Sequence, residues 1–197
     1  MEVTRRSFLA AAGAAPVGVA FTSRPARATA RCVLPESQAG WDAARAAGGR
    51  VVVLPGAVGW DDSLLWRVRA GATVIFESAA GFGDARAFEV QRAGLRSAFG
   101  LTIDEPASLW KAALSPGYVD LHWPLAVKVR DFSSVMGVRG GETVGLLGSR
   151  PVAALQRRGA GAFLFLGSPV GPSLWTRDPQ AQAWLASMQT LGRDATS

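Results

Sequence analysis

The stretch GATVIFESAAGFG, residues 71–83, decides the expected fold. Its β-branched and aromatic run, residues 73–76, is typical of a strand that is buried on both faces. The run stops at Glu77 and Ser78, and small residues follow as far as Gly83. In α/β enzymes a buried parallel strand that ends in such a turn often carries the nucleophile. We therefore expect any functional site to lie at this strand end.

The residues on either side of this stretch alternate between strand and helix patterns. Upstream, RVVVLPG (residues 50–56) predicts a second buried strand, and a helix is expected from an N-cap at Asp61–Asp62 to a stop at Gly71. Downstream, apolar residues at helical spacing predict a helix over residues 84–99, which Gly100 ends. This order indicates parallel strands joined by right-handed crossovers.

The pattern changes after residue 101. Residues 120–138 alternate more strongly and contain a proline, which is typical of antiparallel or edge strands. Residues 143–171 read as three strands joined by two glycine turns, and Asp178 with Pro179 predicts the start of a C-terminal helix. The sequence thus predicts an α/β fold, a three-layer sandwich with a mostly parallel sheet and a late antiparallel hairpin.

The N-terminus has the order of an export signal. Arg5–Arg6 are followed by Ser-Phe-Leu and then by an apolar stretch that is too short to span a bilayer. After this stretch come A-x-A sites that end at Ala28 and Ala30. This order resembles a twin-arginine (Tat) signal peptide. We expect cleavage after Ala28 or Ala30, with the mature protein in the periplasm or otherwise exported through the Tat pathway, and without a stable membrane span.

The remaining chain is expected to form one domain. Residues 1–30 are assigned to the signal peptide, residues 31–191 to an α/β domain and residues 192–197 to a disordered tail. At this length a single domain can bury a full core.

Charge and reactive residues exclude several classes of function. The net charge is +6, but four arginines belong to the signal, and the others are scattered. Because Arg157–Arg158 is the only basic pair after the signal and falls in an expected hairpin turn, we expect no nucleic-acid groove. The single cysteine, Cys32, and the single histidine, His122, offer neither an internal disulfide nor a pair of metal ligands. No phosphate-binding glycine motif is present, so we expect no cofactor and no metal.

Three segments together resemble the class I glutamine amidotransferase-like superfamily, which has a flavodoxin-like fold. They are residues 50–78, AFGLTI (residues 98–103) and GSRPVAALQRRGAGAFLFLGSPVGPSLW (residues 148–175). The last resembles the closing hairpin and final strand of trehalose-utilisation proteins and of the trimerisation domain of certain β-galactosidases. A carbohydrate ligand is an expectation inherited from this resemblance.

The chain departs from the catalytic members of that superfamily. They carry a cysteine at the strand-to-helix elbow and a histidine after the last core strand. Here the elbow falls at residues 77–79 without a cysteine, and GSPVGPSLW, after the last strand, has no histidine. Since a thiolate needs a paired base, the resemblance implies a non-catalytic member.

A crevice at the carboxyl ends of the strands is the expected site. Its expected ligand-binding residues are Glu77, Ser78, Trp60, Ser168 and Trp175. Their ligand would be a small molecule such as a carbohydrate, or a protein partner or second copy of the chain. The competing interpretation of Glu77 is structural: its carboxylate accepts backbone N–H groups at residues 80–81 or pairs with Arg86.

Two alternatives to a binding domain stay open. One is a degenerate hydrolase in which Ser78 acts with Glu77 and His122, although a histidine satisfied by backbone and partly buried is also expected at position 122. The other is a structural or assembly subunit with an exposed edge or aromatic patch. Trp66 and Trp184, at helical positions, are expected in the core.

Overall fold

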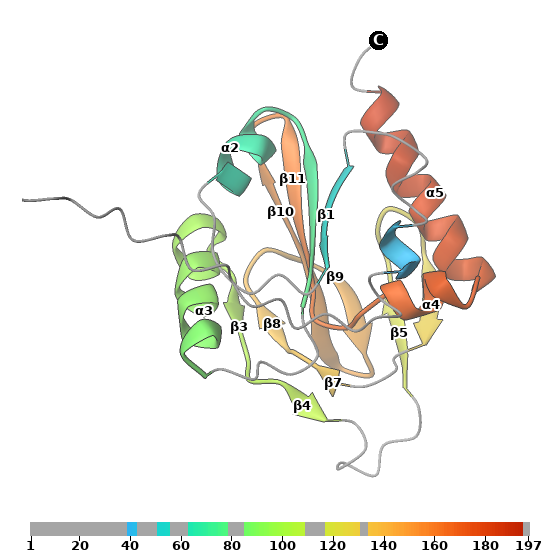
Figure 1. The fold of residues 1–197 in the computed structure, drawn as a ribbon, viewed down its shortest axis with the longest axis horizontal. Helices are drawn as coiled ribbons and strands as arrows, with labels where there is room; N and C mark the ends of the chain where they lie inside the picture. The colour runs from blue at the N-terminus through green and yellow to red at the C-terminus, as the bar shows by residue number, and fades with distance from the viewer. Residues whose placement is uncertain are drawn as a thin grey trace, which may run out of the picture.

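The computed structural model describes residues 39–42, 51–55, 63–78, 85–108, 117–130 and 134–194 (Figure 1). The expected signal peptide, Cys32 and Trp60 lie outside these residues, so the export prediction is not tested. Among the helices of the described residues, none is both long enough and apolar enough to cross a bilayer.

The first half of the described chain forms the strands and helices that the sequence predicts. Their bounds are β1 (Val51–Pro55), α2 (Ser63–Arg69), β2 (Thr73–Glu77) and α3 (Ala85–Phe99). Gly71 and Gly100 follow the two helices with positive φ angles of 96° and 68°. Because glycine adopts this left-handed backbone without strain, these positions end the helices as expected.

The second half is mainly antiparallel strands followed by two helices. Before the long hairpins come β3 (Thr102–Ile103), β4 (Ala107–Ser108), β5 (Tyr118–Leu121), β6 (Val127–Arg130), β7 (Ser134–Val135) and β8 (Val138–Arg139). The hairpins and closing helices are β9 (Glu142–Leu147), β10 (Arg150–Arg158), β11 (Gly161–Leu166), α4 (Gly171–Trp175) and α5 (Pro179–Asp194). Helix α5 thus continues three residues into the stretch that we expected to be a tail.

The main sheet has seven strands in the order β1-β2-β11-β10-β9-β5-β6. Only the β1–β2 and β2–β11 pairs are parallel, whereas the other four neighbouring pairs are antiparallel. The expected mostly parallel, flavodoxin-like sandwich is therefore wrong, and the sheet is mixed and strongly twisted (Figure 1). The error has a physical cause: three of the six neighbouring pairs are antiparallel hairpins, and β11 returns to pair with β2, whose residues precede their partners by 89 positions.

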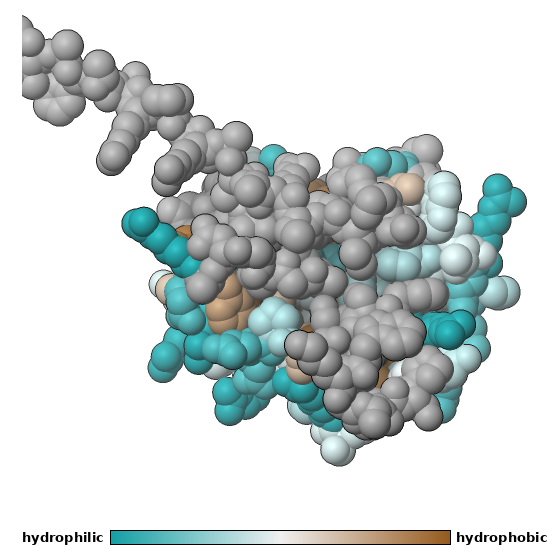
Figure 2. Space-filling model, turned by 60° about the horizontal axis from the view of Figure 1, so that its bottom comes forward, coloured by the Kyte–Doolittle hydropathy of each residue, from teal (hydrophilic) through white to brown (hydrophobic). Residues whose placement is uncertain are grey.

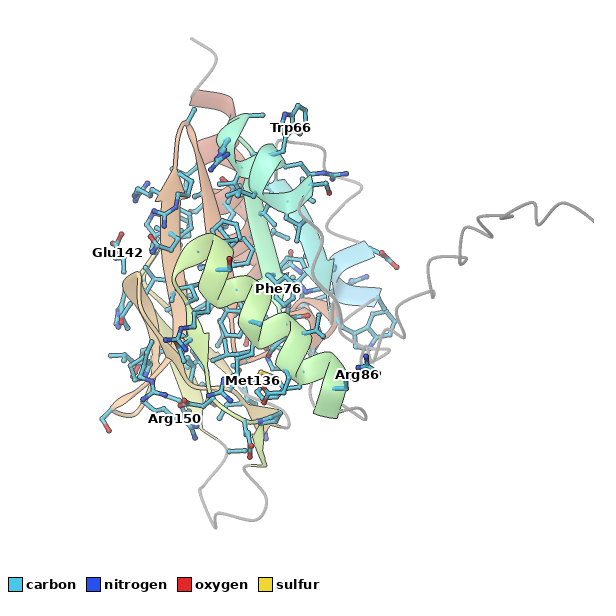
Figure 3. All side chains as sticks on the ribbon, turned by 90° about the vertical axis from the view of Figure 1, so that its left-hand side faces the viewer. Trp66, Phe76, Arg86, Met136, Glu142 and Arg150 are labelled. Atoms are coloured by element: carbon cyan, nitrogen blue, oxygen red, sulfur yellow. The ribbon has the colours of Figure 1, made fainter. Side chains whose placement is uncertain are left out.

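Hydrophobic cores lie on both faces of this sheet. On one face α4, α5 and Trp41 pack against strand residues such as Leu164 and Val129. On the other face α2 and α3 cover β2 and β11, and Phe99 stacks on Phe163 with 3.9 Å between ring centroids. Figure 3 shows α3 crossing in front of Phe76 on this second face.

Of the two tryptophans that were expected in the core, the structure buries one. Trp184 of α5 is fully buried, and its indole Nε1 donates to the backbone oxygen of Trp123 at 2.9 Å. Trp66 is 71% exposed, so its expected place in the core is wrong. In α2 the sheet-facing side is taken by Leu64 and Val68, which turns the neighbouring position 66 outward.

The outer edge of the sheet at β6 is covered by the C-terminal helices. The backbone N–H of Lys128 donates to Oε1 of Gln180 at 2.6 Å, and the backbone oxygen of Arg130 accepts from Oγ of Ser173 at 3.3 Å. An edge strand with free N–H and C=O groups can pair with a strand of another chain. At β6 these side chains hinder such pairing.

Candidate functional site

Glu77 is the last residue of β2 and lies at the carboxyl edge of the parallel strands. In the ladder it stands between Pro55 of β1 and Leu166 of β11. Its side chain is only 1% exposed. A carboxylate in such a position needs strong hydrogen-bond donors, because burying an unpaired charge is costly.

The chain itself supplies those donors. Glu77 Oε1 accepts the backbone N–H groups of Val170 at 2.6 Å and Gly171 at 2.8 Å. Its Oε2 accepts the indole Nε1–H of Trp41 at 2.9 Å. The carboxylate therefore joins β2, the start of α4 and the helical residues 39–42. The structural interpretation of Glu77 predicted this kind of role, but its proposed backbone donors, residues 80–81, lie outside the described residues.

The contact between residues 39–42 and α4 is close. A side-chain carbon at Gly40 would overlap the backbone oxygen of Gly171 and come within 3.0 Å of the backbone N of Trp175. Trp41, next along the chain, is fully buried in the core that contains α4 and α5. This segment therefore covers the strand end, and Trp41 fills the space directly beside the Glu77 carboxylate.

The other predicted site residues do not share one environment. Ser78 and Ser168 are buried, and the backbone N–H of Ser78 donates to the oxygen of Leu166 at 2.8 Å. Trp175 is 57% exposed at the end of α4. Trp60 lies outside the described residues. Three of the four described residues are thus enclosed at the strand end, and Trp175 faces solvent.

Ser78 and His122 do not form a pair. Ser78 follows β2, and His122 follows β5, which is four strand positions away in the sheet. At about 4.8 Å per position the two residues are separated by about 19 Å along the sheet, whereas a serine and its base must be within about 3 Å. His122 is exposed rather than partly buried as expected, and its backbone N–H donates to the oxygen of Val144 at 2.8 Å.

The described residues contain no group of three or more His, Cys, Asp or Glu side chains that could hold a metal ion. The groups around Glu77 that the sequence interpretation missed are Trp41 and the amides of Val170 and Gly171. Backbone amides have no sequence signature, and they lie 93 and 94 residues from their acceptor. The only available signal was the presence of a tryptophan at position 41.

Comparison with known proteins gives partial structural likenesses. No family model and no curated protein sequence matches the chain. Among solved structures, the exo-β-1,4-mannosidase Op5Man5 from Opitutaceae bacterium strain TAV5 is 16% identical with a TM-score of 0.43, over 72% of this chain and 24% of that chain. A β-galactosidase from Bacillus circulans sp. alkalophilus is 16% identical with a TM-score of 0.48, over 71% of this chain and 22% of that chain.

A third likeness is to a smaller protein. A cytoplasmic protein from Salmonella typhimurium LT2 is 12% identical with a TM-score of 0.47, over 67% of this chain and 61% of that chain. The chain thus spans about a quarter or less of the two glycosidases and under two thirds of this third protein.

Proposed function

We propose that the chain is a non-catalytic binding domain of an exported protein and that it holds its partner on its outer surface. The observation that supports this function is the bonding of the buried Glu77 carboxylate, whose two oxygens accept hydrogen bonds from Trp41, Val170 and Gly171. A carboxylate that binds a ligand or transfers a proton must reach that ligand. Here the chain's own groups occupy its oxygens, which favours a protein partner or a second copy of the chain.

A small ligand in the strand-end crevice, including the carbohydrate that the sequence resemblance predicts, would have to displace Trp41. We expect galactose, mannose, glucose and their oligosaccharides to leave the thermal midpoint of the purified chain unchanged in a thermal-shift titration. A sugar at one hundred times its dissociation constant would stabilise the fold by about 2.7 kcal/mol. A saturable rise in midpoint that Ser168→Trp abolishes would contradict surface binding and restore the crevice as the site.

A hydrolase that uses Ser78 makes a different prediction. With p-nitrophenyl acetate and p-nitrophenyl glycosides as substrates, we expect the purified chain, Ser78→Ala and His122→Ala to give the same background rate. The reason is the separation of about 19 Å between the two residues along the sheet. The matched control is Ser187→Ala, a serine on α5 on the opposite side of the sheet from α2 and α3. Loss of turnover in the first two variants and not in this control would show that the chain is an enzyme.

A further inference from the structure

One end of the molecule brings together two stretches of chain that are far apart in sequence. The last turn of α2 and the turn between β10 and β11 lie together at the top of Figure 1. Their backbones touch: a side-chain carbon at Gly159 would come within 3.1 Å of the backbone oxygen of Arg69, and one at Gly161 would overlap the oxygen of Val68. The two glycines therefore permit a close contact that holds both stretches in place.

This contact brings three arginines together. Two come from the last turn of α2 and one from the end of β10, and we call the set the arginine cluster: Arg67, Arg69 and Arg158. Two are exposed and Arg158 is half-buried. Arg157 lies on the opposite face of the sheet, over Trp123, which packs against the core that contains α5. The sequence interpretation treated Arg157–Arg158 as an isolated pair, because nothing in the chain order places α2 beside that hairpin.

The arginine cluster is not neutralised by the ion pairs found between described residues. Those pairs join Glu89 to Arg92, Asp120 to Lys128, and Asp104 to both Arg139 and Arg150. Within the cluster, Arg158 donates to the backbone oxygen of Arg157 at 3.4 Å. This contact supplies no negative charge. Among the acidic residues in strands, Glu142 lies nearest to the turn between β10 and β11. It is exposed, begins β9 and pairs with Leu155 of β10.

An exposed tryptophan adjoins the arginine cluster. Trp66 precedes Arg67 on α2, is 71% exposed, and projects from the outer surface of the helix in Figure 3. Trp66 is the most exposed of the large hydrophobic side chains among the described residues. The described part of the face in Figure 2 is mostly hydrophilic, with a few hydrophobic areas. Tryptophan and arginine are the residues most enriched in the energetic centres of protein interfaces, and a guanidinium binds a carboxylate through two parallel hydrogen bonds.

We propose that Trp66 and the arginine cluster form a docking surface for an acidic peptide segment of a partner protein. This inference rests on the proposed function, because it names the surface and the chemistry of the partner that such a binding domain would hold. Charge complementarity carries it: three arginines without acidic partners among the described residues attract carboxylates over about 10 Å at an ionic strength of about 0.1 M. Trp66 adds an apolar contact beside that charge.

The test uses fluorescein-labelled poly-L-glutamate as the probe and the full purified chain. In fluorescence anisotropy at 50 mM NaCl, the wild-type chain is expected to bind, and binding should be lost at 500 mM NaCl. Arg69→Glu with Arg158→Glu should weaken binding at least about tenfold, the factor that corresponds to 1.4 kcal/mol. Trp66→Ala should weaken binding at both low and intermediate salt, since its contribution is apolar.

A charge-matched control separates this surface from net charge. Arg86→Glu with Arg177→Glu changes the net charge equally, but these residues lie at the start of α3 and between α4 and α5, in segments that follow the carboxyl ends of β2 and β11. Figure 3 shows Arg86 at the other end of the molecule from Trp66. This control should bind within about twofold of wild type, a change of about 0.4 kcal/mol. Circular dichroism melts check folding, and Arg67→Glu with Arg69→Glu replaces the first variant if that variant does not fold.

Three results would overturn the inference. The first is that wild type does not bind polyglutamate at 50 mM NaCl. The second is that the cluster variant and the control variant lose binding equally, which would indicate net charge alone. The third is tighter binding to phosphatidylglycerol vesicles or to DNA than to polyglutamate, with the same dependence on the arginine cluster. None of these results bears on the sugar and substrate assays of the strand-end crevice, so failure here and failure of the proposed function are distinguishable.

Discussion

Replacing Glu77 by alanine is expected to lower the free energy of unfolding by about 4 kcal/mol, because it leaves three buried donors without an acceptor. These donors are the amides of Val170 and Gly171 and the indole of Trp41. The measurement is urea denaturation followed by far-ultraviolet circular dichroism, in which the midpoint should fall while the slope stays the same.

Two control variants make this result specific. Glu77→Gln keeps the size and one acceptor oxygen but turns an amide donor toward one of the three donors, so we expect a loss of about 2 kcal/mol. Glu142→Ala removes an exposed carboxylate and should change stability by less than about 0.5 kcal/mol. If Glu77→Ala were as stable as Glu142→Ala, the structural role of Glu77 would be refuted, and ligand binding would become the better explanation of its position.

Replacing Gly167 by alanine is expected to cost about 3 kcal/mol or more, or to prevent folding, because it forces a side chain into a packed backbone. The N–H of Gly167 donates to the oxygen of Val152 at 2.6 Å, and its own oxygen accepts the N–H of Met136 at 2.7 Å. An added carbon would overlap the oxygen of Met136 and come within 2.9 Å of the oxygen of Val152. The two flanking chains would have to separate, which breaks both hydrogen bonds.

The matched control is Gly148→Ala, in the turn between β9 and β10. An added carbon there meets nothing within 4 Å, although the φ of 60° is left-handed. We expect a loss of about 1–2 kcal/mol from backbone strain alone. Urea denaturation of both variants compares the two costs, and an equal loss would show that the contact with Met136 relaxes without penalty.

The local structure around β2 could be predicted from the sequence alone. The buried runs of β1, β2 and β11, the glycine ends of α2 and α3, and the start of α5 all follow from residues close together in the chain. Asp178, for example, was predicted as an N-cap, and its Oδ1 accepts the N–H groups of Gln180 at 2.8 Å and Ala181 at 3.1 Å. Such features depend on backbone preference and on hydrogen bonds within one turn, so a few neighbouring residues are enough to predict them.

The order of the strands and the groups that surround Glu77 could not be predicted from the sequence, because both depend on the tertiary structure. The run AFLFL predicted a buried strand equally well in a parallel or an antiparallel setting, and in the fold β11 is parallel to β2 and antiparallel to β10. The position of Glu77 at a strand end was visible in the sequence, but its donors Trp41 and Val170 are 36 and 93 residues away. Contacts between residues so far apart depend on how the whole chain packs. The residues near Glu77 in sequence therefore do not show which groups will be buried beside it or donate hydrogen bonds to it.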